Sequence, residues 1–330
     1  VDACVGISGP VVAINDALDP EIDVLITGHT HLPYNCVLPD ADGKPRIVTS
    51  SYSFGRVVTD INLVIDKASK DVRRDLSTAT NHAVASEELS WDPAITAVID
   101  KWQPVFDVAG NTPVGTITAD INRGGDPTGS DRGVESAAGN LVADAQLWAT
   151  SANGADIAFM NPGGVRSDLT FLSSQDPPEG DGVVTFGEAF TFQPFGNTLK
   201  TFPMTGAEIV SALEEQCQPA GSSRPFLHLG VSEGFTYDLS TTIEDIGGVN
   251  TCTGISITDV QLNGVAISPT ASYEVTVNSF LSDGGDNFGT FDTITAPKLD
   301  GGVDLEALTN YLGTFGPVAP PPTDRVNEAP

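Results

Sequence analysis

The sequence predicts an α/β segment followed by an α+β domain, with a single helix between them. In the first segment, apolar runs such as residues 22–26 and 57–65 are separated by turns, which is typical of strands in a layered sheet. Further along the chain, helical and strand-like patterns occur in mixed order. We therefore expect part of a sheet domain, a connector, and a separate mixed domain.

The sheet part is expected over residues 1–75 and the connector over residues 76–111. The chain is polar and turn-rich between residues 71 and 90, and residues 92–107 then carry a helical spacing of apolar side chains. Pro93 falls in the first turn of that helix, where a missing amide hydrogen breaks no helical hydrogen bond. Strands of the sheet part are predicted at residues 22–26, 37–38, 47–50 and 57–65.

The second domain is expected over residues 112–330, and its helices are the clearest elements. Residues 136–150 repeat apolar side chains at helical spacing. A second helix, over residues 205–216, opens with Thr205 three residues before Glu208, which is the spacing of a capping box.

Strand patterns alternate with these helices. Asn263-Gly264 is a strong signal for a two-residue hairpin turn. The proline run at residues 320–322 predicts an extended strap or linker. Strands are expected at residues 157–160, 183–185, 234–239, 257–262 and 273–277.

The composition is that of a globular and very acidic protein. Its 330 residues are 40% hydrophobic, and 15 basic against 44 acidic side chains give a net charge of −29. Such a charge repels nucleic-acid polymers and anionic membrane surfaces. Small anions remain possible ligands if some of the nine arginines are concentrated in one pocket. No apolar stretch of the sequence has the length of a transmembrane helix.

The four cysteines favour an extracytoplasmic protein. They are Cys4, Cys36, Cys217 and Cys252, which allow three pairings that the sequence alone does not distinguish. Proximity favours Cys4–Cys36 and Cys217–Cys252, each closing a loop of roughly 30 residues and contributing about 3 kcal/mol. Four reduced core thiols are the alternative.

Gly28-His29-Thr30-His31 follows the first predicted strand and has the character of part of a metal site. Loops at the carboxyl ends of strands hold ligands in α/β sheets, and two imidazoles two residues apart can converge on metal ions. A two-metal site needs several more carboxylate, amide or imidazole ligands, and the residues before Gly28 supply no credible set. The chain is therefore expected to begin inside a domain.

Two further segments combine backbone freedom with polar chemistry. Residues 161–166, Asn-Pro-Gly-Gly-Val-Arg, bring an arginine fork beside glycines that allow close approach to a ligand. Residues 279–288 place Phe280 and Asp286 around a glycine turn, where they could stack a base and accept hydrogen bonds from ribose hydroxyls. Taken singly, each segment is also compatible with an ordinary turn, and the second with a calcium loop.

The remaining candidates are less specific. Phe195 lies on a proline-glycine corner and could be exposed enough to stack on a planar ligand, although most phenylalanines belong to cores. Arg132 precedes the helix at residue 136 and could instead form a surface ion pair with Glu135. His82 and His228 are interpreted as structural.

Together these motifs resemble the secreted 5′-nucleotidases, which include bacterial periplasmic nucleotidase/UDP-sugar hydrolases and the animal ecto-enzyme. The resemblance runs from about residue 23 to residue 326. Each motif alone is weak evidence for the family. Five motifs that occur in the order and at the spacing of the family are specific evidence for it. The motifs are Gly28-His29-Thr30-His31, Gly139-Asn140-Leu141 with Asp144, residues 161–166, Pro194-Phe195-Gly196-Asn197 and residues 278–288.

The resemblance implies a calcineurin-like metallophosphatase domain that holds two divalent metal ions, such as zinc or manganese, and a C-terminal α+β domain that binds the nucleotide. It implies that His29 is a ligand of one metal and His31 of the other. This chain would then contain only the C-terminal part of the metal domain. No catalytic residue is assigned, because the other metal ligands of the family have no counterpart before Gly28.

The resemblance also implies roles for the second domain. Phe195 and Phe280 would sandwich the base, Asn161 would hydrogen-bond its edge, and Asp286 would bind the ribose hydroxyls. The ribose and phosphate would face Arg132 and Arg166.

The expected function is hydrolysis of nucleoside 5′-monophosphates by a secreted, metal-dependent enzyme, extracellular or periplasmic. This chain is expected to supply nucleoside recognition and to be inactive alone. The alternatives are a UDP-sugar hydrolase, a 2′,3′-cyclic-nucleotide phosphodiesterase, a noncatalytic nucleotide-binding surface protein, or a structural module whose arginines and phenylalanines are merely packed.

Overall fold

The computed structural model describes residue 4 and residues 6–85, 90–173 and 179–328, and the chain divides into two compact units. One unit ends at Ile99 and the other begins at Asp100. The helix predicted from the spacing of residues 92–107 forms as α2 (Pro93–Gly110), and the boundary between the units lies within it. Within the described residues, no helix combines the length and apolar character needed to cross a membrane.

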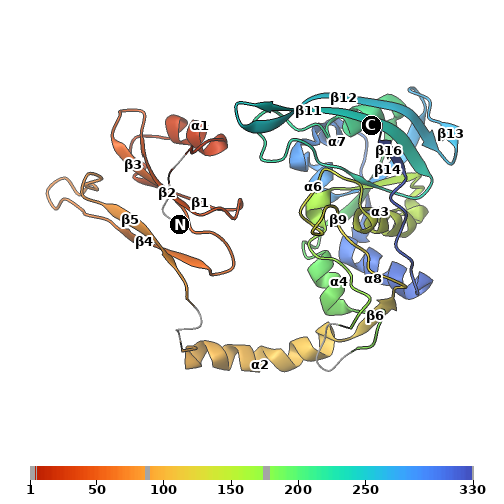
Figure 1. The fold of residues 1–330 in the computed structure, drawn as a ribbon, viewed down its shortest axis with the longest axis horizontal. Coiled ribbons are helices and arrows are strands. Elements are labelled where there is room, and N and C mark those ends of the chain that lie inside the picture. The colour runs from red at the N-terminus through yellow and green to blue at the C-terminus, as the bar shows by residue number, and fades with distance from the viewer. Residues whose placement is uncertain (1–3, 5, 86–89, 174–178, 329–330) are drawn as a thin grey trace. The chain divides into compact units, whose positions relative to one another are not determined.

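The first unit, which is coloured red to orange in Figure 1, is built around a small β-sheet. Its elements are α1 (Pro10–Ala17), β1 (Val24–Thr27), β2 (Tyr34–Pro39), β3 (Pro45–Ser50), β4 (Val57–Asn62) and β5 (Thr78–Ala83). The sheet has the order β1-β3-β2, in which β1 and β3 are parallel and β2 is antiparallel to β3. Strands β4 and β5 form a separate antiparallel ribbon.

A buried arginine connects this sheet to the chain around α1. Arg46 on β3 is fully buried, and its guanidinium donates hydrogen bonds to the backbone oxygens of Asn15, Asp19 and Ile22 at 2.7–2.8 Å. A buried guanidinium is tolerated where carbonyl oxygens satisfy its donors. The disulfide Cys4–Cys36 adds a covalent link to β2.

Strand β5 occupies residues for which the sequence indicates only polar, turn-rich chain. Its residues are mostly polar, so no apolar alternation reveals the strand. Pairing with β4 forms it, and the buried Asn81 then ties the ribbon to the sheet. The Asn81 side-chain amide donates to the backbone oxygens of Tyr34 and Ser50 at 3.1 and 3.2 Å. No local sequence pattern predicts contacts between residues so far apart in the chain.

The second unit is an α+β domain, coloured from yellow to blue in Figure 1. Its helices are α3 (Ala137–Ala149), α4 (Phe186–Phe192), α5 (Gly206–Glu214), α6 (Ser279–Ser282), α7 (Gly289–Thr293) and α8 (Asp304–Phe315). Its strands are β6 (Pro113–Thr116), β7 (Ile157–Met160), β8 (Val183–Thr185), β9 (Thr198–Thr205), β10 (Gly230–Val231), β11 (Phe235–Ile246), β12 (Val249–Leu262), β13 (Val265–Ala266), β14 (Ser272–Asn278), β15 (Leu299–Val303) and β16 (Val326–Glu328).

Two larger sheets and a short ribbon make up the strand structure of this unit. The main sheet has the order β10-β7-β14-β9-β15, in which β7 and β14 are parallel and the other neighbours are antiparallel. The second sheet, β13-β12-β11-β16, contains the long β11–β12 hairpin. Strands β6 and β8 pair separately. This mixed order confirms the predicted fold class.

The core of the second unit consists of two apolar clusters. One includes Phe159, Phe202 and Phe235 and joins the main sheet to β11, β12 and α5. The other joins α3 to α8 and includes Leu141, Leu308 and Leu312. Between them, these clusters hold α3 and the main sheet in fixed positions.

Several local predictions are confirmed in this unit. Helix α3 begins after Ser136, whose side chain accepts a hydrogen bond from the amide of Gly139. Helix α5 opens with the capping box of Thr205 and Glu208. A two-residue turn at positions 263–264 joins β12 and β13. The predicted disulfide Cys217–Cys252 forms here, and the predicted disulfide Cys4–Cys36 forms in the first unit.

The C-terminal segment is an extended strap, as the proline run predicts. Val318 pairs with Ile117, and β16 pairs in parallel with β11. A buried ion pair fastens the strap to α3, because Arg325 donates two hydrogen bonds to the Asp144 carboxylate at 2.7 and 2.8 Å. The side-chain amide of Asn140, also on α3, donates to the backbone oxygen of Pro322.

Candidate functional site

Loops from three neighbouring strands of the main sheet meet at one edge. Asn161 directly follows β7, and β14 ends at Asn278. These strands are parallel neighbours, so their carboxyl ends lie on the same side of the sheet. Strand β9 is antiparallel to β14, with Leu199 opposite Asn278, so the corner at residues 194–197 reaches this edge too. We call this place the loop edge.

A chain of hydrogen bonds orders the polar side chains at the loop edge. The amide of Asn278 donates to Oδ1 of Asn161 at 3.0 Å, and Nδ2 of Asn161 donates to Oδ2 of Asp286 at 3.0 Å. Both asparagines are buried. Nδ2 of Asn161 has a second hydrogen, which remains available to a ligand.

Asp286 is held by its backbone as well as by its side chain. Its φ of 55° lies in the left-handed region, which aspartate adopts more readily than most residues. The amide of Gln218 donates to the Asp286 backbone oxygen at 2.9 Å, and Oε1 of Gln218 accepts from Asn287 at 2.7 Å. The turn therefore presents the carboxylate in a fixed orientation.

Gly163 leaves space between the acidic and basic groups of the loop edge. A Cβ atom at this position would lie 3.2 Å from Nη1 of Arg132, 3.3 Å from Oδ2 of Asp286 and 3.5 Å from Nδ2 of Asn161. An added Cβ would crowd Arg132 and Asp286 and would contact Asn161 at an ordinary distance. Glycine thus allows Arg132, Asp286 and Asn161 to converge on one spot.

Four of the nine arginines in the sequence are close enough to interact electrostatically at the loop edge. Burial lowers the pKa of Arg132, and the positive charges of Arg224, Arg166 and Arg123 lower it further, whereas Asp286 opposes the shift. Like charges gathered at this density create a positive potential in an otherwise acidic chain.

Hydrogen bonds fix two of these arginines. Nε of Arg123 pairs with Asp168 at 3.1 Å, and its Nη1 donates to the Arg166 backbone oxygen at 3.0 Å. Nη1 of Arg166 donates to the backbone oxygen of Gly163 at 3.2 Å. Arg123, Arg132 and Arg166 line a cavity of about 100 Å³, together with Gly124, Gly129, Asp131, Val134, Ser136, Pro162 and Val165.

Two aromatic rings are exposed beside this cluster. The Phe195 side chain is 57% exposed, and the Arg166 guanidinium carbon lies 5.7 Å from its ring centroid. Phe280 is 43% exposed, and its ring packs on the backbone of Gly285, where an added Cβ would lie 2.5 Å from a ring carbon. Exposed rings held in this way offer flat apolar faces to a ligand.

The two candidate metal ligands lie in the first unit. His29 and His31 follow β1 and are exposed, and both have left-handed backbone angles, with φ of 71° and 57°. The loop after the parallel strand β3 reaches the same edge, where the His31 ring contacts Phe54 at 5.3 Å between centroids. Positive φ also occurs at ordinary turns of this chain, such as Lys70 and Asn263, so it does not by itself mark His29 and His31 as functional.

Comparison with known families identifies the second unit. The sequence model of the family described as "5′-nucleotidase, C-terminal domain" matches residues 113–293. The chain belongs to this family. The match includes every loop-edge residue named above, so the resemblance inferred from the motifs is confirmed.

Individual relatives agree with this assignment. The cell wall protein Lmo0130 of Listeria monocytogenes is 31% identical over 306 residues, covering 89% of this chain and 36% of that protein. The trifunctional nucleotide phosphoesterase protein YfkN of Bacillus subtilis is 27% identical, covering 93% of this chain and 20% of that protein. The chain thus spans well under half the length of these two relatives.

Solved structures share the fold of this 5′-nucleotidase relative. A 5′-nucleotidase precursor from Thermus thermophilus superposes with a TM-score of 0.59 at 24% identity, covering 93% of this chain and 59% of that one. A putative 5′-nucleotidase from Staphylococcus aureus gives a TM-score of 0.62 at 17% identity, covering 93% and 56%. Both matches extend across most of the chain.

The donor set of the first unit does not complete a metal site. Imidazole nitrogens are suitable ligands for zinc, whereas manganese prefers oxygen ligands, and His29 and His31 are exposed. The described residues nevertheless contain no group of three histidine, cysteine or acidic side chains able to hold a metal ion. Two imidazoles alone do not constitute a two-metal centre.

The structure brings five of the six predicted substrate-binding residues into direct or near contact. Arg132, Asn161 and Asp286 surround Gly163, and Arg166 contacts both the Gly163 backbone and Phe195. Phe280 lies at the same sheet edge, next to the Asp286 turn. The alternative ion pair of Arg132 with Glu135 does not form, because Glu135 accepts from Asn140 and from the strap instead.

Sequence reasoning missed the residues that support this cluster. Arg123, Asp168 and Gln218 hold the others in place but belong to no recognised motif. An arginine directly before the glycine pair at residues 124–125, in a chain with few arginines, was a usable signal for Arg123. Gln218 and Asp168 carry no such local signal.

Proposed function

We propose that the second unit recognises the nucleoside and phosphate of a nucleoside 5′-monophosphate, within a secreted, metal-dependent 5′-nucleotidase activity. The observation that carries this proposal is the convergence of Arg132, Asp286 and Asn161 around Gly163. A positive and a negative group fixed a few ångströms apart suit a ligand that is anionic at one end and rich in hydroxyls beside it.

The arginines provide the phosphate side of this site. Guanidinium groups donate pairs of hydrogen bonds to phosphate oxygens. Arg132 and Arg166 line the same cavity, while Arg123 is already occupied by Asp168. We therefore assign phosphate binding to Arg132 and Arg166, with Arg123 as a support.

The remaining loop-edge residues would bind the nucleoside. The Asp286 carboxylate can accept hydrogen bonds from both ribose hydroxyls, and the free amide hydrogen of Asn161 can reach the base edge. Stacking between Phe195 and Phe280 would bind any base, because every base has a flat π face. Base preference would then depend on Asn161.

His29 and His31 are proposed as ligands of two divalent metal ions, one each. Such ions, if bound, would lower the pKa of a coordinated water molecule. The two imidazoles would contribute neutral nitrogen donors. Because the described residues supply no further ligand cluster, we expect the 330-residue chain alone to hydrolyse AMP poorly even with added zinc or manganese.

An extracytoplasmic location fits this activity. Two disulfides are typical of proteins from oxidising compartments. The similar Listeria protein is named a cell wall protein. We propose secretion or attachment outside the cytoplasm.

Calorimetric titration of the purified chain with AMP and adenosine tests the binding proposal. We expect Phe280→Ala to weaken both ligands about tenfold, since stacking on one ring contributes roughly 1–3 kcal/mol. Arg166→Ala should weaken AMP more than adenosine, since it removes a phosphate contact. Phe190→Ala, at an exposed ring outside the cluster, and Arg73→Ala, at an exposed ion pair, are matched controls. Equal affinities in all variants would contradict the proposal.

A second candidate is hydrolysis of other nucleotide phosphate esters, and the trifunctional Bacillus relative favours it. Comparing the binding of AMP, 2′,3′-cyclic AMP and UDP-glucose separates the two. Preference for AMP supports the nucleotidase, and preference for either of the others supports the second candidate.

A further inference from the structure

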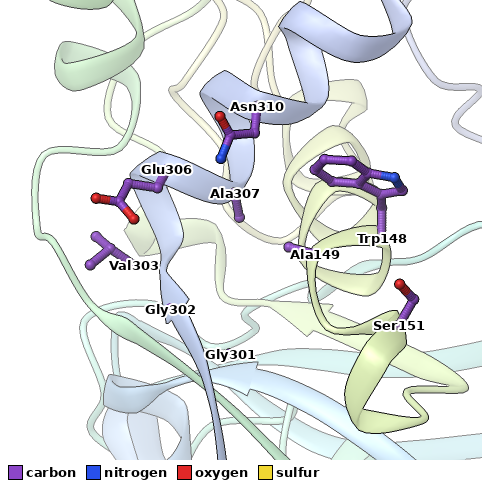
Figure 2. Close-up of a pocket in the computed structure, with 9 residues that line it drawn as sticks. All are labelled: Trp148, Ala149, Ser151, Gly301, Gly302, Val303, Glu306, Ala307 and Asn310. Atoms are coloured by element: carbon purple, nitrogen blue, oxygen red, sulfur yellow. The ribbon is translucent and has the colours of Figure 1, made fainter.

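A second cavity lies away from the loop edge, and Figure 2 shows the residues around it. It has a volume of about 380 Å³ and lies between the end of α3, the glycine bend of β15 and the first turns of α8. Its lining residues are Trp148, Ala149, Ser151, Gly301, Gly302, Val303, Glu306, Ala307 and Asn310. We propose that this pocket binds a neutral monosaccharide unit, and we call it the α3–α8 pocket.

Trp148 gives the pocket an aromatic wall. Its ring is held by Tyr311 and Phe315, which meet it edge-to-face with centroid distances of 6.0 and 5.7 Å. The indole is therefore positioned before any ligand arrives, at little cost in side-chain entropy on binding. A fixed indole suits the apolar C–H face of a pyranose ring.

Polar groups surround the space beside the indole. Ser151, Glu306 and Asn310 carry hydroxyl, carboxylate and amide groups, and no hydrogen bond of these side chains occurs within the described residues. Together they supply both donors and acceptors. Figure 2 shows the small side chains Ala149 and Ala307 between these groups, where they leave room for a ligand.

The floor of the pocket exposes backbone groups. Strand β15 loses its register with β9 between Asp300 and Val303, so the intervening glycines are not paired in the ladder. Gly302 has a φ of 86°, and a Cβ at Gly301 would lie 2.4 Å from a Thr150 methyl carbon. Glycine is required at Gly301 because a Cβ there would clash with Thr150, and Gly302 has a positive φ that glycine adopts readily.

The charge of the pocket selects against nucleotides. Among the described residues that line it, Glu306 is the sole ionisable side chain, so a phosphate would be repelled. A quaternary ammonium ion prefers several aromatic faces around it, whereas this lining has one aromatic residue and several hydrogen-bonding groups. A neutral polyhydroxyl ligand fits best, and the volume falls at the small end of ligand pockets, about 300–1,000 Å³.

This pocket is independent of the loop edge. Ser136, at the start of α3, lines the arginine cavity, and Trp148 lies at the other end of the same 13-residue helix. At 1.5 Å per residue the two ends are about 20 Å apart. A saccharide in the α3–α8 pocket is thus not the sugar of a nucleotide bound at the loop edge.

Titration of the purified protein with glucose and N-acetylglucosamine, followed by calorimetry and ligand-observed NMR, tests this inference. We expect saturable binding with a Kd on the order of millimolar. Asn310→Ala and Glu306→Ala, both at exposed positions, should each weaken it about fivefold, equivalent to one hydrogen bond. Trp148→Ala should abolish it. Glu244→Gln on the exposed hairpin is the matched control.

The proposal of sugar binding at the α3–α8 pocket and the proposal of nucleotide binding at the loop edge can be tested independently of each other. Phe280→Ala should leave sugar binding unchanged, and AMP should not compete with either sugar. Absence of saturable sugar binding, competition by AMP, binding of choline in place of the sugars, or unchanged affinity in both Asn310→Ala and Glu306→Ala would each overturn the inference.

Discussion

At the scale of single residues, the loop edge depends on groups that fix one another. Asn278 orients Asn161, Asn161 holds the Asp286 carboxylate, and Gln218 holds the Asp286 backbone. Such a preordered set loses little entropy when a ligand arrives. Small changes in its geometry are therefore expected to affect binding more than stability.

Gly163→Ala tests this expectation. The added methyl group would press on Arg132 and Asp286 at 3.2–3.3 Å, so AMP should bind about tenfold more weakly, roughly 1.4 kcal/mol. The melting temperature should change little. Gly289→Ala, whose nearest neighbour would be 3.7 Å away, is the control. Unchanged AMP affinity in Gly163→Ala would show that these three side chains do not form the binding site.

His228 provides a separate prediction about pH. Burial lowers its pKa to about 4, although its Nδ1 donates to the Leu229 backbone oxygen and Glu328 lies 3.8 Å from its Nε2. Between pH 6.5 and 4 the unfolded chain binds a proton at this site that the folded chain does not. Stability should therefore fall as the pH falls through this window, by up to about 3 kcal/mol from this group.

Denaturant unfolding of the original protein and of His228→Asn over this pH range measures the effect. The asparagine does not titrate but can keep the hydrogen bond to Leu229, so the variant should show a shallower pH dependence. Parallel stability curves would contradict the assigned cause.

At the scale of elements, helices and turns were predictable because their signals are local. The capping box before α5 and the Asn263-Gly264 turn depend on residues only a few positions apart. Strand β5 and the buried Arg46 depend on partners far along the chain, and no local pattern reports them. The same contrast applies at the site, where motif residues were found but the supporting Arg123 and Gln218 were missed.

The Asp144–Arg325 pair tests how the strap is held against α3. Arg325→Leu would leave a buried carboxylate without its partner, which typically costs about 3–5 kcal/mol of unfolding free energy. The double variant Asp144→Leu with Arg325→Leu should recover much of this loss. Chemical denaturation measures both, with Arg73→Ala at an exposed pair as the control, where about 0–1 kcal/mol is expected. A small effect of Arg325→Leu would mean that strand pairing alone holds the strap.

At the scale of the whole molecule, the chain concentrates positive charge at one place in a very acidic protein. Its net charge is −29, yet four of its nine arginines act on the loop edge. That contrast is the simplest reason to assign a small anion to this site. Each compact unit also contains its own disulfide, consistent with two separately stabilised parts.

A crystal structure of the chain with AMP tests the central claim most directly. The account predicts the phosphate against Arg132 and Arg166, the ribose hydroxyls on Asp286, and the base between Phe195 and Phe280. A nucleotide bound elsewhere on the second unit, or in the loop edge with its phosphate turned away from the arginines, would contradict it.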